Sequence, residues 1–269
     1  MLSDSKRVHQ VDKKFETDVS NEKFVNQLFI RLVALDKQFT KVDFKYSIFD
    51  TCYLRKCKFD SCDFTGCRFV GTNLFEAKFS NCEFRYAIFE KTLIDNYILE
   101  QECPEEENLK MRFARSLRIN YQSIGDAESA NKAMSVELQA TEEHLYKSWN
   151  ANSTYYRNKY KGWNRLKAFT QWVQFKLLDF IWGNGESAWK LLRAVLIIFA
   201  LMTLIDVLAF RNTESIDSYI QSFFDAPQIF LGTLSPSNYP SPYLTAILFI
   251  RLVAFGFFMS IIIKRFNRR

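Results

Sequence analysis

Residues 39–99 have the sequence FTKVDFKYSIFDTCYLRKCKFDSCDFTGCRFVGTNLFEAKFSNCEFRYAIFEKTLIDNYIL. Every fifth residue is Phe, Leu or Ile, and these anchors are Phe39, Phe44, Phe49, Leu54, Phe59, Phe64, Phe69, Leu74, Phe79, Phe84, Phe89, Ile94 and Leu99. A period of five matches neither an α-helix nor a flat strand. It indicates a chain that turns one corner every five residues, so that four corners make one square coil.

A second register lies two residues before each anchor and holds mostly small side chains: Val42, Ser47, Cys52, Cys57, Cys62, Cys67, Thr72, Ala77, Cys82, Ala87 and Thr92. Both registers should point inward. Stacked coils pair their backbones like neighbouring strands, about 4.8 Å apart. The anchors predict roughly three coils and a height of about 15 Å.

This pattern resembles the pentapeptide-repeat family, whose members form a right-handed quadrilateral β-helix. The resemblance implies such a β-helix over residues 37–103. The phase continues backwards through Phe24 and Phe29, but Ala34 breaks it. We therefore expect residues 1–36 to be an N-terminal cap, helical or irregular over 22–36.

Five of the six cysteines occupy the inward register, Cys103 being the exception. A buried thiol behaves as a compact hydrophobe, which is the interpretation that we favour. The alternative is a metal site, since Cys52, Cys57, Cys62 and Cys67 lie on successive faces of one coil. The short C-x-x-C hairpins of zinc sites are missing. We therefore expect no metal and no cofactor. We expect no disulfide either, because the N-terminus has no secretory signal and a cytosolic compartment keeps thiols reduced.

The sequence predicts a helical hairpin over residues 104–158, with its turn at Gly125 and Asp126. One hairpin cannot bury its own apolar face, so it should dock on the β-helix or on another subunit. Residues 159–186 predict an amphipathic helix and a turn. Its Trp, Phe and Lys residues are typical of a helix lying in a headgroup region. An ordinary surface helix packed on a core is the alternative.

Residues 187–269 contain two long apolar runs, Ala194 to Phe210 and Tyr243 to Ile263, which predict membrane spans over 190–210 and 243–264. Buried core helices are the alternative. Cations flank the outer ends of both runs, whereas segment 211–242 has Arg211 as its one cation. The positive-inside rule predicts that both termini lie in the cytoplasm. The expected location is the bacterial inner membrane. These cations explain much of the net charge of +6, so no specific nucleic-acid partner is expected.

The segment between the spans predicts a short helix over 218–231, followed by an extended return with three prolines. Over residues 160–269, the order of a span, a short pore helix, an extended return and a second span resembles the layout of the two-transmembrane potassium-channel family. The filter TVGYG is missing, and GTLSPS (232–237) stands in its place. The resemblance implies a homotetrameric α-helical channel-like domain with a re-entrant pore segment over 218–238, but it implies no potassium selectivity.

The resemblance also implies roles for individual residues. Gly232, Thr233, Leu234, Ser235 and Ser237 would form the filter, with Asp225 in or behind the pore helix. Gly256 would be a hinge of the inner helix, and Phe255, Met259 and Ile263 would form an apolar gate.

Each span carries one charge, and a charge in hydrocarbon requires a partner or a pore. Asp206 lies twelve residues beyond Ala194, and Arg251 lies twelve residues before Ile263. Both positions are about 18 Å from the cytoplasmic boundary, which predicts an Asp206–Arg251 ion pair. The alternative is a ring of four Arg251 side chains in the lumen, which would favour anions.

The favoured function is a homotetrameric ion channel that opens when a signalling ligand or partner protein binds its cytoplasmic module. By analogy with bacterial membrane effectors, it would depolarise phage-infected cells; ion homeostasis is an equal alternative. A membrane-anchored scaffold without conductance is the second hypothesis. A DNA mimic is disfavoured by ten Lys/Arg against nine Asp/Glu over residues 37–100. An enzyme is not expected, because catalytic motifs are missing and only His9 and His144 are present.

Overall fold

The computed structural model describes residues 7–150 and 153–266, with side chains as far as Ile263. The chain forms two compact units, residues 1–169 and 170–269. Each unit has its own core of buried apolar side chains. Helix α5 (Trp163–Trp182) contributes residues to both units.

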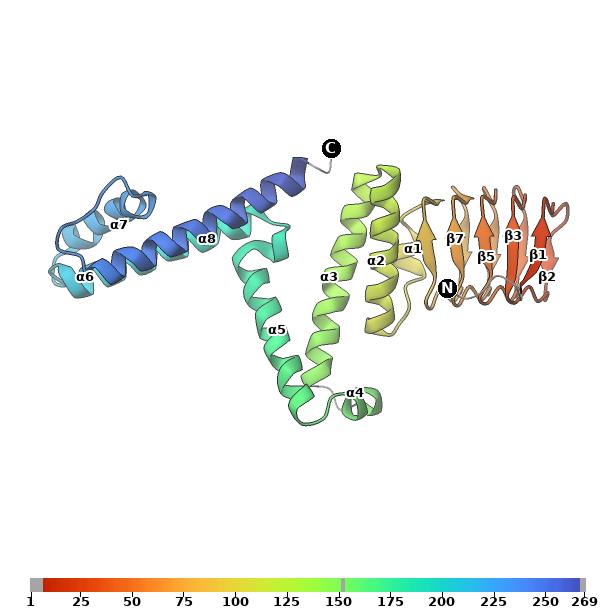
Figure 1. Ribbon diagram of the computed structural model, residues 1–269, viewed down its shortest axis with the longest axis horizontal. Helices are drawn as coiled ribbons and strands as arrows, with labels where there is room; N and C mark the ends of the chain where they lie inside the picture. The colour runs from red at the N-terminus through yellow and green to blue at the C-terminus, as the bar shows by residue number, and fades with distance from the viewer. Residues whose placement is uncertain (1–6, 151–152, 267–269) are drawn as a thin grey trace. The chain divides into compact units, whose positions relative to one another are not determined.

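The first unit begins with a β-helix of short, parallel strands (Figure 1). One sheet contains β1 (Val8–Val11), β3 (Gln27–Ile30), β5 (Ile48–Asp50), β7 (Arg68–Val70) and β10 (Ile88–Glu90). A second contains β2 (Val19–Ser20), β4 (Gln38–Thr40), β6 (Lys58–Asp60) and β9 (Lys78–Ser80), and β8 (Asn73–Leu74) pairs with β11 (Leu93–Ile94). Corner residues with positive φ recur every five positions from Arg31 to Lys91. The predicted corner every five residues is confirmed.

Residues 1–6 of the predicted cap lie outside the described residues. The expectation of a helical or irregular cap before residue 37 is wrong for the described part, because β1, β2 and β3 lie within residues 7–36. Strand β1 pairs with β3 at an offset of nineteen residues (Val8↔Gln27), whereas β3 pairs with β5 at an offset of twenty (Leu28↔Ile48). The first coil is thus one residue short. The largest sheet stacks five strands, so the β-helix is about 19 Å tall rather than about 15 Å.

Exchanged side-chain sizes in the second coil interrupt the period-five pattern next to this first coil. Ala34 is small at an anchor position and Leu32 is large at the second register, yet both are buried. The exchange leaves the packed volume of that corner nearly unchanged. Phe15 fills the neighbouring place in the first coil, and its ring contacts Phe24 and Phe39 at 5.7 and 5.4 Å.

The phenylalanine anchors stack in columns along the axis of the β-helix. Parallel rings lie 4.9–5.2 Å apart in the columns Phe39–Phe59–Phe79, Phe44–Phe64–Phe84 and Phe49–Phe69–Phe89. This spacing follows from the separation of the paired backbones, which holds each ring in contact with the ring one coil away.

The small residues of the second register are hydrogen-bond donors as well as packing groups. Cys57 Sγ donates to the carbonyl oxygen of Ala34 at 3.2 Å, and Thr72 Oγ1 donates to that of Phe49 at 3.0 Å. Ser47, Cys52, Cys62, Cys67, Cys82 and Thr92 make the same bond to the residue 23 positions earlier. Burial raises the pKa of Cys57 to about 11, so its thiol keeps the proton that it donates. Cys, Ser and Thr are therefore equivalent here, and the cysteines serve packing and hydrogen bonding.

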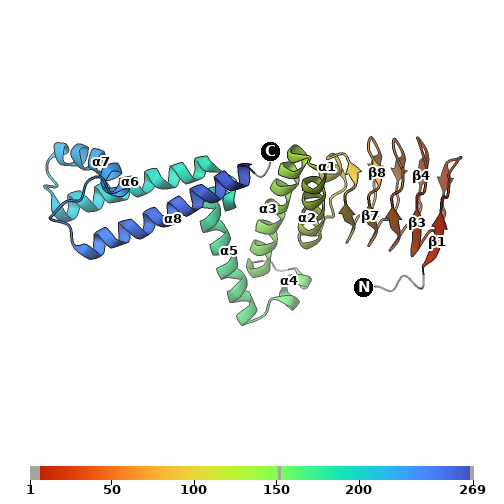
Figure 2. The same ribbon diagram turned by 45° about the horizontal axis from the view of Figure 1, so that its top comes forward.

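The β-helix ends against a helical hairpin (Figures 1 and 2). After α1 (Ile98–Gln101), helices α2 (Glu107–Ile124) and α3 (Ala127–Asn150) pack on each other, with left-handed Gly125 between them. The ring of Phe113 on α2 lies 5.7 Å from Phe84 and 5.9 Å from Phe89. The hairpin therefore buries its apolar face on the last coil, one of the two docking sites expected from the sequence.

Side chains on α2 also pair with the open backbone edge of that coil. Asn120 Nδ2 donates to the carbonyl oxygen of Thr92 at 2.8 Å, and the Thr92 N–H donates to Asn120 Oδ1 at 2.7 Å. The Phe89 N–H donates to Ser116 Oγ at 2.9 Å. The amide group of Asn120 thus takes the place of the backbone groups that a further coil would supply. This protects a strand edge that would otherwise pair with other chains.

Replacing Asn120 with alanine should lower the free energy of unfolding by about 2 kcal/mol, because two buried backbone groups of Thr92 lose their partners. Chemical denaturation of the full chain in detergent micelles measures this effect. Ile119→Ala is the matched control, since Ile119 is exposed on the same helix and should change stability by about 0.5 kcal/mol or less. Equal losses in the two variants would contradict the capping role.

Helix α5 follows α4 (Thr154–Lys159) and has exposed apolar residues along its length. Leu166, Phe169, Val173, Leu177 and Phe180 all remain accessible. Their i+3 and i+4 spacing places them on one stripe of the helix. This exposure suits the predicted interfacial helix better than a helix packed on a core.

After its part of α5, the second unit contains a short 3-10 turn, η2 (Gly183–Gly185), and the helices α6, α7 and α8. Helices α6 (Ala188–Phe210) and α8 (Ser241–Phe266) run side by side, and α7 (Ile216–Leu231) lies at the end of this pair away from η2 (Figures 1 and 2). Ser187 caps α6 by accepting the Lys190 N–H at 3.2 Å. Residues 188–210 and 241–263 are long and apolar enough to cross a membrane, which points to membrane association.

Candidate functional site

Helix α7 and the chain that follows it form the segment between the two candidate spans. The buried face of α7 consists of Ser222, Ala226, Ile229 and Phe230. Ser222 Oγ donates to the carbonyl oxygen of Thr203 on α6 at 3.4 Å, and the ring of Phe230 lies 5.4 Å from Phe199. The helix therefore packs along α6, as one wall of a core that also contains Met202, Tyr239 and Ile247.

A cluster of charges fixes the C-terminal end of α6 to the middle of α7. Arg211 Nε lies 2.7 Å from Asp206 Oδ2, and Arg211 Nη2 lies 2.6 Å from Asp225 Oδ2. The Tyr239 hydroxyl donates to the other oxygen of Asp206. Asp206 is only 3% exposed. One guanidinium thus bridges a buried carboxylate on α6 and a partly buried one on α7, the fork geometry for which arginine is suited.

The structure contradicts the expected Asp206–Arg251 ion pair, because Asp206 pairs with Arg211 instead. The expectation placed the two charges at equal depth by counting from the ends of the apolar runs. In the structure Asp206 lies four residues before the end of α6, whereas Arg251 lies ten residues after the start of α8. These helix lengths correspond to about 6 Å and about 15 Å, so the two charges lie at different levels.

Arg251 instead lies against the C-terminal end of α7. A Cβ atom added to Gly232 would be 2.2 Å from Arg251 Nη1. Gly232 also ends α7 with φ +81°, in the left-handed region that favours glycine. No ion pair joins Arg251 to a carboxylate among the residues that the structure describes. Its charge faces the carbonyl end of a helix, where the helix dipole is negative.

The remaining filter candidates lie in the return segment after α7. Thr233, Ser235 and Ser237 are exposed, and Leu234 packs against the core of the second unit. Thr233 Oγ1 donates to the carbonyl oxygen of Gln228 at 3.1 Å, and its N–H donates to the same oxygen at 2.9 Å. The end of α7 therefore holds Thr233 in place, whereas the two serines are accessible.

The hinge and gate candidates lie on α8. Phe255, Met259 and Ile263 are exposed. A Cβ atom added to Gly256 would meet nothing within 4 Å, so no close packing requires a glycine there. The structure thus places the filter candidates after α7 and the gate candidates one to three turns beyond Arg251 on the same helix.

Two residues of the charge cluster were missed by the sequence reasoning. Arg211 was counted only as the one cation of segment 211–242, although it follows Asp206 by five residues. Tyr239 was counted only as part of the extended return. Burial and the Asp206 carboxylate raise the pKa of Tyr239, so its hydroxyl stays a donor. The signal that could have found Arg211 is its isolation among acidic residues next to a charged span.

Comparison with known proteins supports the repeat module. Residues 38–74 match the family model of pentapeptide repeats, with eight copies. No curated protein matches the chain significantly. Two solved structures of trypsin-treated QnrB1, a plasmid-mediated fluoroquinolone resistance protein, are 17% and 19% identical, with TM-scores of 0.19 and 0.12. They cover 34% of this chain and 64% and 55% of theirs, less than two thirds of those chains. The family match and the stacked parallel strands together identify the N-terminal module as a pentapeptide-repeat β-helix.

Proposed function

We propose that the chain forms a homotetrameric ion channel of the bacterial inner membrane, gated through its cytoplasmic pentapeptide-repeat module. The observation that carries this proposal is the segment between the two candidate spans. A sixteen-residue helix, α7, packs on the first span, and residues 232–240 then return to the second span with exposed hydroxyl groups. A connection that only joined two anchors would need neither element.

The exposure of the two candidate spans supports a membrane location and self-assembly. Only 33% of the apolar window in α6 and 11% of that in α8 are buried. Core helices of a soluble protein would be mostly buried, so these surfaces require lipid or further copies of the chain. Fourfold closure would bring the return segments together around one axis.

Arg251 makes anion selectivity the expected property of this pore. A cation without a described carboxylate partner, next to the end of the pore helix, favours anions when four copies surround a lumen. A role in depolarising phage-infected cells belongs to the same proposal and rests on the analogy of architecture.

Purified full-length chain in a planar bilayer should conduct, with a reversal potential displaced toward that of chloride in a KCl gradient. Arg251→Gln should remove at least half of this displacement, because it removes the cation from the lumen. Gly256→Ala is the test of the hinge. Its methyl group meets no neighbour, so it should alter open probability while the conductance of the open channel stays within about twofold.

The outcomes separate the channel from its alternative. If Arg251→Gln still conducts and its reversal potential is unchanged, Arg251 does not line the pore. A chain that never conducts, with neutral and with anionic lipids, would favour the membrane-anchored scaffold.

A further inference from the structure

A strongly basic stretch runs from the last turns of α3 through α4 into α5. Between Glu143 and Asp179 the sequence has no acidic residue, and its seven cations are Lys147, Arg157, Lys159, Lys161, Arg165, Lys167 and Lys176. A solvated helix normally mixes both signs of charge, as α2 and α3 do here. The charge imbalance indicates an anionic partner for this stretch.

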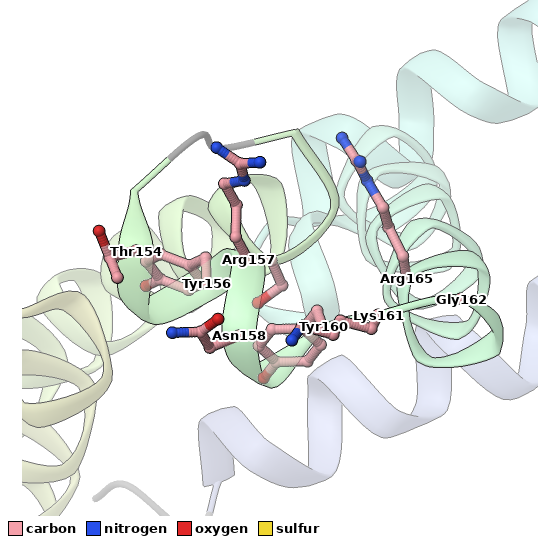
Figure 3. Close-up of a pocket in the computed structure, with 9 residues that line it drawn as sticks. Thr154, Tyr156, Arg157, Asn158, Tyr160, Lys161, Gly162 and Arg165 are labelled. Atoms are coloured by element: carbon pink, nitrogen blue, oxygen red, sulfur yellow. The ribbon is translucent and has the colours of Figure 1, made fainter.

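Three of these cations line one cavity of 460 Å³ in the first unit. Arg157 comes from α4, Lys161 from the turn after it, and Arg165 from the first turns of α5. Figure 3 shows the guanidinium groups of Arg157 and Arg165 extending to the same side, whereas Lys161 lies lower in the view, beside Tyr160. Ser148, Thr154 and Asn158 add neutral hydrogen-bonding groups to the lining.

Neutral side chains hold much of the wall of this cavity in place. His144 on α3 forms hydrogen bonds with the Tyr156 hydroxyl through Nδ1 at 3.0 Å and with the Tyr160 hydroxyl through Nε2 at 3.4 Å, which ties α4 to α3. The nearby carboxylate of Glu107 is paired with Lys147 at 2.8 Å.

The cationic ends of the lining side chains have no acidic partner. No ion pair joins Arg157, Lys161 or Arg165 to any carboxylate in residues 7–150 and 153–263. Arg165 keeps its Nη groups for other partners while its Nε donates to the carbonyl oxygen of Trp149. The site is thus an open pocket whose lining carries three positive charges.

We propose that this cavity binds a phosphate group. The two guanidinium groups on one side of the pocket match the oxygens of a phosphate, and Lys161 adds positive charge to the lining. The volume suits a small ligand or a headgroup. The exposed Trp163 and Leu166 beside the cavity add an apolar surface of the kind that accompanies headgroup contact. A lipid headgroup and a free phosphate compound are the two sources of this chemistry. The proposal does not depend on whether the chain conducts ions.

The test uses the full chain in phosphatidylcholine nanodiscs, titrated calorimetrically with pyrophosphate at constant ionic strength. A parallel arm uses mixed phosphatidylcholine and phosphatidylglycerol nanodiscs, and native mass spectrometry counts the phosphatidylglycerol molecules that the protein retains. Arg157→Gln/Lys161→Gln should weaken pyrophosphate binding, or reduce retained phosphatidylglycerol, by about tenfold or more. The melting temperature should stay unchanged, because both residues are exposed and make no described ion pair.

The control variant is Lys167→Gln/Lys176→Gln, which removes the same charge from the same basic stretch but from outside the cavity. It should retain binding within about twofold. Pyrophosphate binding that depends on the cavity identifies a free phosphate compound as the ligand class. Phosphatidylglycerol retention that depends on the cavity identifies a lipid headgroup. Equal losses in the two variants, or no binding of either probe, would overturn the proposal.

Discussion

Replacing Arg211 with methionine is expected to destabilise the second unit by about 3 kcal/mol. The guanidinium of Arg211 is the only described cation within 4 Å of Asp206 and of Asp225. Without it, Asp206 is a buried carboxylate with one remaining donor, the Tyr239 hydroxyl. Removing one partner of a buried ion pair leaves a charge uncompensated in a medium that solvates it poorly. Unfolding in mixed detergent micelles, followed by circular dichroism, measures the loss.

Arg251→Met is the matched control for this prediction. It removes the same charge from the same unit and introduces the same side chain, but no described carboxylate loses a partner. Its cost should be about 1 kcal/mol or less. If Asp206 and Arg251 were paired, as equal depth in the two spans predicts, the two variants would be equally destabilised. The comparison therefore decides between the two partners of Asp206.

A rescue variant shows whether the lost stability is electrostatic. Asp206→Asn should be costly alone, yet in the Arg211→Met background it removes the uncompensated charge and keeps an acceptor for Tyr239. The double variant should regain about 1–2 kcal/mol relative to Arg211→Met. Additive losses instead would mean that Arg211 acts by packing rather than through its charge.

The β-helix was predictable because its periodicity follows from backbone geometry. One corner every five residues places every anchor inside, whatever its exact type, so Phe, Leu and Ile serve alike. The first coil was not predictable from anchors alone. In the second coil Ala34 and Leu32 exchange sizes, which interrupts the period. In the first coil the one-residue deletion before Val19 shifts Phe15 out of phase. A pattern that considers side-chain size at one position at a time misses cases in which two neighbouring positions exchange sizes and keep nearly the same total volume.

The candidate site was predictable only in outline. Hydropathy marks both spans, and glycine with prolines marks the return segment, because these signals are local in sequence. The partner of Asp206 depends on where α6 ends and how the chain turns back, which no local pattern gives. Asn120 is likewise an ordinary polar residue in the sequence, and its capping role exists only because α2 lies on the last coil.

Phe64→Ala is expected to destabilise the β-helix by about 4 kcal/mol. The ring of Phe64 is buried at the centre of the middle column, with Phe44 and Phe84 stacked on either side at 5.2 and 5.0 Å. Each neighbouring coil is held by its own backbone hydrogen bonds, so the coils cannot move together to close the cavity. The substitution should therefore fall in the upper part of the range for buried aromatic truncations. Denaturation of the full chain in micelles measures it.

Two further substitutions show whether the coils unfold as one unit. Phe75→Ala truncates a ring that is 44% exposed on the next face, and it should cost about 1 kcal/mol or less. Phe24→Ala truncates a partly buried ring in the terminal coil, where each repeat has fewer neighbours. If the coils unfold together, Phe24→Ala lowers the single transition by less than Phe64→Ala. A separate early transition in Phe24→Ala would instead mean that the first coil frays alone and that the stack unfolds one coil at a time, as expected of an array in which only adjacent repeats touch.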